Sequence, residues 1–205
     1  MLNILILTYN LTSILVAKKY NLPVIADEIY EDMVFTGNQY IPLAKIAVEA
    51  GVAVLTCSGL SKRFLVPGWR VGWIAIGEYG GIDLSQIRKG LFDLSTLIIG
   101  SCTLIQAALP EIFESTPESF YQRVNLILQE NAKYLSEELG KIDGLKVIEP
   151  QGTMYMLIGI ESEKFDFNNT DTYDADAAEP LDVIVSQILL SEQNVSVLPG
   201  SVNTN

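Results

Sequence analysis

Hydrophobic and polar residues along the first half of the chain follow the spacing of short helices and buried strands. Residues 13–20 have the pattern of the end of an amphipathic helix, and the turn at residues 21–23 ends it. A second helix is expected over residues 42–49. Three apolar runs rich in β-branched residues predict buried strands, at residues 24–26, 52–56 and 71–76. Alternating helices and strands predict an α/β sheet, in which ligands bind outside the carboxyl ends of strands.

The second half of the chain has longer helices and paired strands. Its expected helices cover residues 84–94, 103–113, about 118–142 and 180–191. Its expected strands cover residues 145–148, 153–160 and 195–198, and residues 161–180 have the acidic, aperiodic composition of a loop. The change of pattern predicts an α/β domain over residues 1–117 and a smaller α+β domain over residues 118–205.

Composition and charge narrow the classes of function. The net charge of −12 repels nucleic-acid phosphates and anionic lipid, so neither is an expected partner. The chain contains no histidine, which excludes Ser-His-Asp and Cys-His catalysis. Two cysteines in a chain of this length favour a reducing compartment. The apolar N-terminal stretch is too interrupted for a membrane span and lacks the basic start of a signal peptide, so the cytoplasm is expected.

Three residues at the ends of predicted strands carry the candidate chemistry. Asp27 follows the first strand, Lys62 follows the second, and Arg70 precedes the third. Each alone is more often a cap, a surface residue or an ion-pair partner. Together they suit pyridoxal phosphate, which needs a lysine amine, a carboxylate for its pyridine nitrogen and donors for its phosphate. The planar fork of an arginine donates two parallel hydrogen bonds to such a phosphate.

Sequence motifs around these residues resemble those of a known family. Residues 59–72 (GLSKRFLVPGWRVG) are similar, position by position, to the cofactor-attachment signature of class I aminotransferases. Residues 26–30 (ADEIY) resemble the family's upstream strand-end motif, and residues 150–155 (PQGTMY) a motif of its small domain. The stretch 58–73 resembles the tyrosine aminotransferase branch most. The resemblance covers about residues 14–200.

The resemblance implies a fold and roles for individual residues. The first domain would be part of the cofactor-binding large domain, a mostly parallel sheet with helices on both faces. Lys62 would form the Schiff base with pyridoxal phosphate and carry the proton between substrate and cofactor. Asp27 would pair with the pyridine nitrogen, and Tyr30 would hydrogen-bond the cofactor's phenolic oxygen. The implied partners are an amino acid, aromatic and tyrosine-like, and a 2-oxo acid, and the full-length family typically forms homodimers.

The resemblance also implies a phosphate site. Ser61 and Arg70 would bind the phosphate. Many members have a serine three residues before the lysine, where this chain has Gly59, and the neighbouring Ser58 is the candidate that substitutes for it.

Two departures from the family pattern lead to the expectation of a fragment. The family's glycine-rich loop, ring-stacking aromatic residue and Asn-Pro motif are not found before residue 24, and no arginine for the substrate carboxylate follows residue 198. The chain is therefore expected to be truncated at both ends. Three functions stay open: transamination, a catalytically impaired aminotransferase-like fragment, and a related lyase reaction of the same cofactor.

Overall fold

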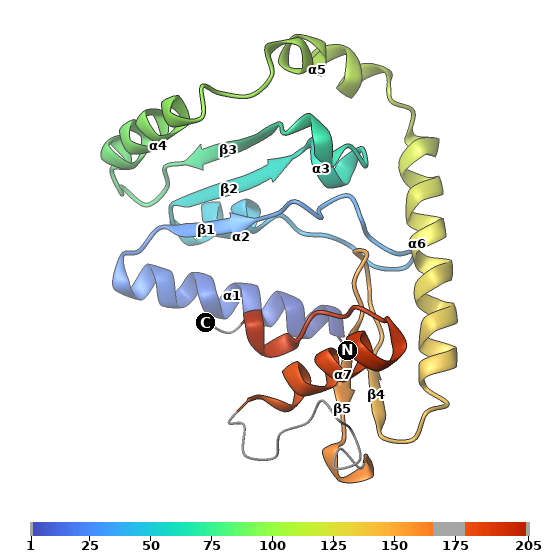
Figure 1. Cartoon of the computed structure of the whole chain (residues 1–205). Helices are drawn as coiled ribbons and strands as arrows, with labels where there is room; N and C mark the ends of the chain where they lie inside the picture. The colour runs from blue at the N-terminus through green and yellow to red at the C-terminus, as the bar shows by residue number, and fades with distance from the viewer. Residues whose placement is uncertain (1, 166–178, 204–205) are drawn as a thin grey trace. The chain divides into compact units, whose positions relative to one another are not determined.

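The computed structural model describes residues 2–165 and 179–203, with side chains described from 11 to 165 and from 179 to 201. Helices and strands succeed each other up to residue 77, three consecutive helices follow, and a pair of strands comes after them (Figure 1). With η for a short 3-10 helix, the order is α1 (Leu2–Tyr20), β1 (Val24–Asp27), α2 (Leu43–Ala50), β2 (Val54–Gly59), α3 (Leu60–Arg63), η1 (Pro67–Trp69), β3 (Gly72–Gly77), α4 (Ser85–Leu97), α5 (Thr103–Ser115), α6 (Glu118–Leu139), β4 (Leu145–Ile148), β5 (Leu157–Ile160), η2 (Ser162–Lys164), α7 (Leu181–Gln193) and η3 (Gly200–Asn203). Within the described residues, no helix is long and apolar enough to cross a membrane.

Most of the expected helices and strands are present, and the prediction of one strand is wrong. The helices expected from residue 42 onward all occur, with ends that differ by a few residues. The strand expected at residues 153–160 shortens to β5, and residues 195–198 do not form a strand. The Asn194 backbone turns into the left-handed region at φ 56° at the end of α7, and residues 195–198 pair with no strand in the described chain. An apolar run without a pairing partner cannot form a ladder. Residues 166–178 of the expected loop lie outside the described residues.

The chain divides into two compact units. The first contains residues 1–127 together with Gln151–Thr153, and the second contains Leu128–Pro150 together with residues 154–205. The second unit holds an antiparallel pair of strands, β4 and β5, with Leu145 opposite Ile160. The assignment of residues 1–117 to a large domain and 118–205 to a small domain stays a prediction.

The sheet of the first unit has the order β1-β2-β3 and is mixed. β1 runs parallel to β2, whereas β3 runs antiparallel to β2. A parallel pair needs a crossover connection, and the chain makes one through α2 between β1 and β2. Between β2 and β3 the chain passes through the short helices α3 and η1 and returns at the same edge, with Gly72 opposite Gly59, so β3 runs in the opposite direction. The expectation of a mostly parallel sheet thus becomes a mixed sheet in the described residues.

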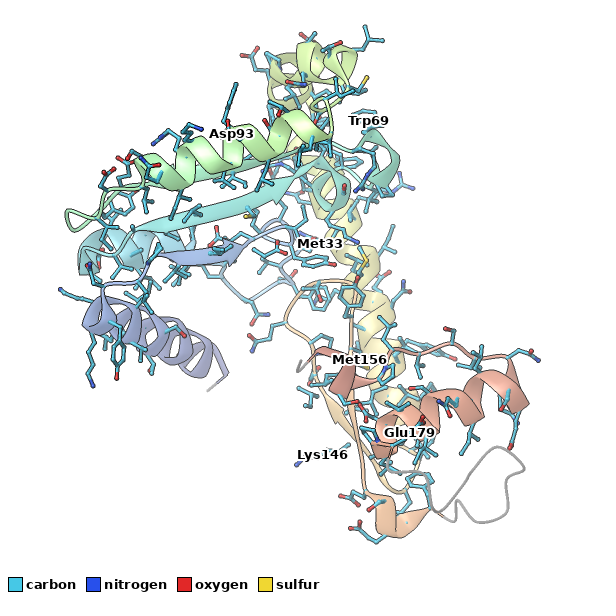
Figure 2. All side chains as sticks on the ribbon, turned by 60° about the vertical axis from the view of Figure 1, so that its left-hand side comes forward. Met33, Trp69, Asp93, Lys146, Met156 and Glu179 are labelled. Carbon is cyan, nitrogen blue, oxygen red and sulfur yellow. The ribbon has the colours of Figure 1, made fainter. Side chains whose placement is uncertain are left out.

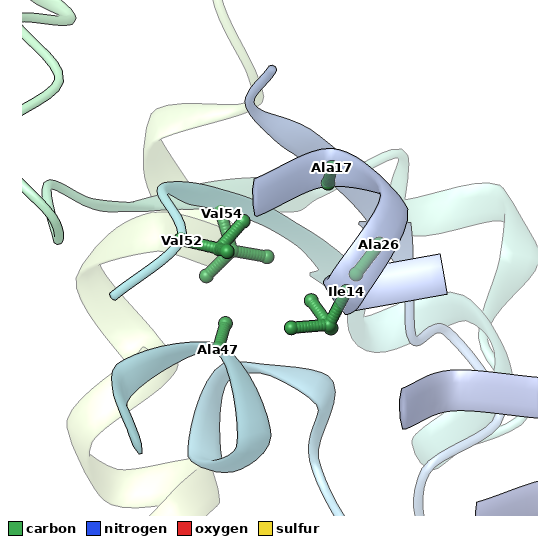
Figure 3. Packing of buried hydrophobic residues seen from close by; sticks show 6 residues of the cluster. All are labelled: Ile14, Ala17, Ala26, Ala47, Val52 and Val54. Carbon is green, nitrogen blue, oxygen red and sulfur yellow. The ribbon is translucent and has the colours of Figure 1, made fainter. Parts of the chain in front are cut away.

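Buried side chains cover both faces of this sheet. On one face, α1 and α2 pack against β1 and β2, through Ile14, Ala17, Ala26, Ala47, Val52 and Val54 (Figure 3). On the other face, the buried Leu55 packs with Leu84 and with Leu91 of α4. Val54 and Leu55 are consecutive in β2 and point to opposite faces, as a pleated strand requires. The expected α/β layering, with helices on both faces, is confirmed.

A buried carboxylate joins the end of β1 to the start of α2. Glu28, 9% exposed, accepts a hydrogen bond of 2.7 Å from the backbone N–H of Leu43. Leu43 is the first residue of α2, and such an N–H has no partner inside its own helix. Burial and the nearby negative charge of the Glu28 carboxylate raise the pKa of Tyr40 well above its usual range. Glu28 thus holds α2 next to the position of Asp27.

Glu28→Ala is expected to destabilise the chain by about 1–3 kcal/mol, because it leaves the N–H of Leu43 without its acceptor. Glu28→Gln keeps an acceptor oxygen and should lose less. Urea unfolding of the full chain measures both, with Glu49→Ala at the exposed end of α2 as the control. An unfolding midpoint of Glu28→Ala equal to that of the control would show that the cap contributes nothing.

Candidate active site

The carboxyl ends of β1 and β2 meet at one edge of the sheet. The strands are parallel, and their register pairs Asp27, the last residue of β1, with Cys57 of β2. The N–H of Glu28 donates to the carbonyl of Cys57 at 2.8 Å, so the two segments stay hydrogen-bonded beyond the end of β1. β3 begins at the same edge, with Gly72 opposite Gly59. Residues predicted to serve one cofactor therefore arrive at this edge from all three strands (Figure 1).

The structure brings Lys62 and Tyr30 together. Lys62 lies in α3, three residues after the end of β2, and Tyr30 lies three residues after the end of β1. The Lys62 Nζ is 5.5 Å from the centroid of the Tyr30 ring, within the range of a cation–π contact. Both residues are half-buried. The pair combines an amine that can bond to an aldehyde with a phenol that can donate a hydrogen bond beside it.

Asp27 lies on the face of the sheet opposite to the α1–α2 core. Ala26 packs into that core, so the next side chain of the strand points to the other face. Asp27 is exposed, and its Oδ1 accepts a hydrogen bond of 3.2 Å from the N–H of Ile29. Burial, and with it the negative charge of Asp27, raises the pKa of the Cys57 thiol. The carboxylate is thus held at the strand end, with Cys57 as its neighbour on the same face.

Thiol labelling is expected to modify Cys102 before Cys57, because Cys102 is exposed and Cys57 is half-buried with a raised pKa. The raised pKa moves the labelling of Cys57 to higher pH, since the thiolate is the reactive form. Asp27→Asn removes the smaller of the two causes, so it should move the labelling partway back and speed labelling of Cys57 by up to about tenfold at neutral pH. Mass spectrometry of the labelled peptides measures both rates, and Cys102 is the internal control. An equal labelling rate of Cys57 in both proteins would show that the charge of Asp27 does not act on this thiol.

Of the predicted phosphate ligands, Ser58 lies in β2, whereas Ser61 and Arg70 lie between β2 and β3. Ser61 precedes Lys62 in α3 and is half-buried. The Ser58 hydroxyl donates a hydrogen bond to Glu31 Oε1 at 3.1 Å. Arg70 is exposed, and its Nη1 donates to the carbonyl of Pro67 at 3.0 Å. A guanidinium has five N–H donors, so others remain for an anion. The roles of these residues stay predictions.

Backbone conformation shapes the loop between α3 and β3. Leu65 and Arg70 adopt left-handed φ values of 57° and 53°, which cost a non-glycine residue roughly 1 kcal/mol each. At the other end of α3, a Cβ on Gly59 would lie 2.9 Å from the carbonyl oxygen of Val71. A serine at position 59 would therefore push β3 away from β2. The close approach of these strands explains the glycine. Side chains around this edge are drawn in Figure 2, where Met33 and Trp69 are labelled.

Residues that the sequence did not single out hold this edge together. Arg63 forms ion pairs with Glu31 at 3.7 Å and Asp32 at 3.1 Å. Residues 151–153 return to the segment after Tyr30: the carbonyl of Gln151 accepts from Phe35 at 2.9 Å, and the Thr153 N–H donates to Met33 at 2.8 Å. Local sequence patterns do not predict such contacts. The one signal for Arg63 was its position directly after Lys62.

The chain belongs to the aminotransferase class I and II family, whose sequence profile matches residues 10–204. Tyrosine aminotransferase of Mus musculus is 42% identical over 187 residues, 91% of this chain and 38% of the mouse protein. S-alkyl-thiohydroximate lyase of Arabidopsis thaliana is 31% identical over 186 residues, 90% of this chain and 37% of the plant protein. The crystal structure of tyrosine aminotransferase from Leishmania infantum superimposes with a TM-score of 0.80 at 25% identity, over 95% of this chain and 44% of that chain.

These similarities confirm the family and the fold expected from the motifs. The chain spans less than half the length of the relatives it matches.

Proposed function

We propose that this chain carries the lysine-bearing side of a pyridoxal-phosphate site that transfers an amino group from an aromatic amino acid, tyrosine first, to a 2-oxo acid. The observation that carries the proposal is the Lys62 amine 5.5 Å from the Tyr30 ring, at the sheet edge where β1 ends in Asp27. The 42% identity to a tyrosine aminotransferase supports the aromatic substrate.

The donor set at this edge fits the cofactor. The cofactor, when bound, supplies an electron sink for the carbanion that forms when the substrate loses its α-proton. Lys62 would hold it covalently, with loss of one water, and would then move the proton between substrate and cofactor. Asp27 would keep the pyridine nitrogen protonated, since a carboxylate stabilises the adjacent positive charge. Tyr30 would donate a hydrogen bond to the phenolic oxygen, and Ser61 and Arg70 to the phosphate.

The proposed reaction is balanced without a further reactant. Tyrosine and a 2-oxo acid exchange amino group and carbonyl oxygen, so the products are the 2-oxo acid of tyrosine and a new amino acid. No external oxidant or reductant is needed. The test is to incubate the full chain with pyridoxal phosphate, tyrosine and a 2-oxo acid, and to measure the two products together. Equal amounts of both support transamination, whereas no product above the Lys62→Ala background would contradict it.

A lyase reaction is the second candidate, favoured by the 31% identity to S-alkyl-thiohydroximate lyase. The same lysine, carboxylate and tyrosine serve both reactions. In each reaction the same cofactor stabilises the carbanion or the bond cleavage with which the reaction begins. A substrate with a carbon–sulfur bond separates them. Thiol release in the absence of a 2-oxo acid would favour the lyase, and dependence on the 2-oxo acid would favour the aminotransferase.

We also propose that the protein works as a homodimer, and the apolar segment from α4 to α5 supports this. Its large side chains are strongly exposed: Leu97 76%, Ile98 75%, Ile99 94% and Leu104 79%. Exposed apolar patches of this kind mark contact surfaces. Ile99→Glu is expected to shift the protein from dimer to monomer in light scattering, whereas Lys133→Glu on α6 should not. A wild-type monomer at all concentrations would contradict the proposal.

A further inference from the structure

Among the described residues of the first unit, Arg63 is the cation with the most contacts to charged and aromatic side chains. Its guanidinium forms ion pairs with Glu31 and Asp32. Three aromatic rings surround it, with centroids 5.8 Å away for Phe64, 5.3 Å for Phe113 and 5.5 Å for Tyr121. The Arg63 side chain is 26% exposed. A planar, weakly hydrated guanidinium suits such a position, where it can stack on rings and pair with carboxylates.

The arginine connects the two segments that carry the proposed cofactor residues. It directly follows Lys62 in α3, and its partners Glu31 and Asp32 directly follow Tyr30. Two consecutive residues of one segment therefore meet consecutive residues of the other: Lys62 lies against Tyr30, and Arg63 lies against Glu31 and Asp32.

Glu31 holds both ends of the segment that contains Lys62. Its Oε1 accepts a hydrogen bond from the hydroxyl of Ser58 before α3 and faces Nη1 of Arg63 at the end of α3. Two backbone hydrogen bonds fix the segment around Glu31 in turn: its own N–H donates to Glu28 at 3.0 Å, and the N–H of Met33 donates to Tyr30 at 2.9 Å. The position of Tyr30 is thereby tied to the position of α3.

We propose that Arg63 is a positioning residue for the cofactor, which acts through Glu31 and Asp32 to hold Tyr30 against the amine of Lys62. This inference rests on the proposed function, since it assigns Arg63 to the same site. No other described cation pairs with Glu31 or Asp32. Without Arg63, the two carboxylates would be left beside each other and near Glu118, and their repulsion would move the segment that carries Tyr30.

The electrostatics of Asp32 agree with this role. Burial raises the pKa of Asp32, the Arg63 guanidinium lowers it, and the negative charge of Glu118 raises it further. Arg63 is therefore what favours the charged form of a carboxylate in partly buried surroundings. Removing the cation removes that compensation and leaves a partly desolvated charge without its partner.

The test is the pH dependence of the visible absorbance of cofactor bound to the full chain. Tyr30 stabilises the ionised phenolic oxygen of the cofactor, so loss of its hydrogen bond raises the pH midpoint of the absorbance change. Arg63→Ala is expected to raise this midpoint by about one pH unit and to weaken cofactor binding by about tenfold. Arg63→Lys keeps the charge but loses the planar fork, and it should recover part of both effects.

Two further variants separate positioning from a general loss of stability. Arg88→Ala breaks an ion pair of the same length, 3.1 Å to Glu78, but one whose side chains are 58% and 42% exposed. It should leave midpoint and affinity unchanged. Tyr30→Phe should raise the midpoint by itself, and Arg63→Ala added to Tyr30→Phe should raise it no further, because the arginine acts through the tyrosine.

The outcomes distinguish this inference from the proposed function. Absorbance that depends on Lys62, with a midpoint that Arg63→Ala raises, supports both. Absorbance that depends on Lys62, with a midpoint that Arg63→Ala leaves unchanged, overturns the positioning role and leaves the proposed function intact. A wild-type chain without such absorbance overturns both. Where Arg63→Ala fails to fold, Asp32→Asn decides, since it removes one ion pair and should raise the midpoint by a smaller amount.

Discussion

Replacing Lys62 by alanine is expected to abolish covalent binding of pyridoxal phosphate and to lower turnover by at least about a hundredfold. The Lys62 amine is the group that lies against Tyr30 at the sheet edge, and alanine has no nitrogen to bond to the aldehyde. Loss of the amine also removes the base that would move the substrate's α-proton. Absorbance spectra with pyridoxal phosphate measure the first effect, and product formation measures the second.

Two control variants make the Lys62 result specific. Lys62→Arg keeps a cation that can lie over the Tyr30 ring but cannot form the covalent bond, so it should lose the absorbance as completely as alanine does. Lys45→Ala removes an exposed lysine of α2 in the same unit and should bind cofactor normally. Absorbance retained in Lys62→Ala, or lost equally in Lys45→Ala, would show that another amine holds the cofactor.

Asp27→Asn is expected to lower turnover by about 10²–10³ while the cofactor remains attached to Lys62. An amide has nearly the same size as the carboxylate, and its oxygen can still accept from the Ile29 N–H. It carries no negative charge, however, so the pyridine nitrogen would lose the group proposed to keep it protonated, and the cofactor would become a weaker electron sink. Turnover and visible absorbance of the same sample separate catalysis from binding.

The control for this variant is Asp93→Asn on α4. Asp93 is exposed and pairs with Lys89 at 2.6 Å, so its loss changes the net charge by the same amount without touching the sheet edge. Asp27→Glu restores the negative charge on a longer side chain and should recover part of the turnover. Normal turnover in Asp27→Asn would remove this carboxylate from the mechanism.

Sequence patterns predicted the elements that depend on local chemistry. The helices of the second half follow the 3.6-residue spacing of their apolar residues, and β1 and β2 follow short β-branched runs between turn residues. The positions of Asp27 and Lys62 at strand ends also came from these patterns. Parallel pairing of β1 and β2 then places both strand ends at one edge, as an α/β sheet requires.

Features that depend on contacts between distant residues could not be predicted in this way. The direction of β3 is set by the connection through α3 and η1, which returns to the edge where β2 ends, and not by its own apolar pattern. Residues 195–198 have strand-like residues, but a strand forms only where a partner pairs with it. The pairing of Arg63 with Glu31 and Asp32, and the clash that excludes a side chain at Gly59, arise only once β1, β2 and β3 lie together.

Borohydride reduction of the cofactor-loaded chain, followed by mass spectrometry of its peptides, tests most directly whether Lys62 carries the cofactor. Reduction makes the bond between the lysine and the cofactor permanent, so the modified residue can be identified. The expected result is a single modified lysine at position 62, lost in Lys62→Arg. Modification spread over exposed lysines such as Lys89 and Lys133, with Lys62 unmodified, would contradict it.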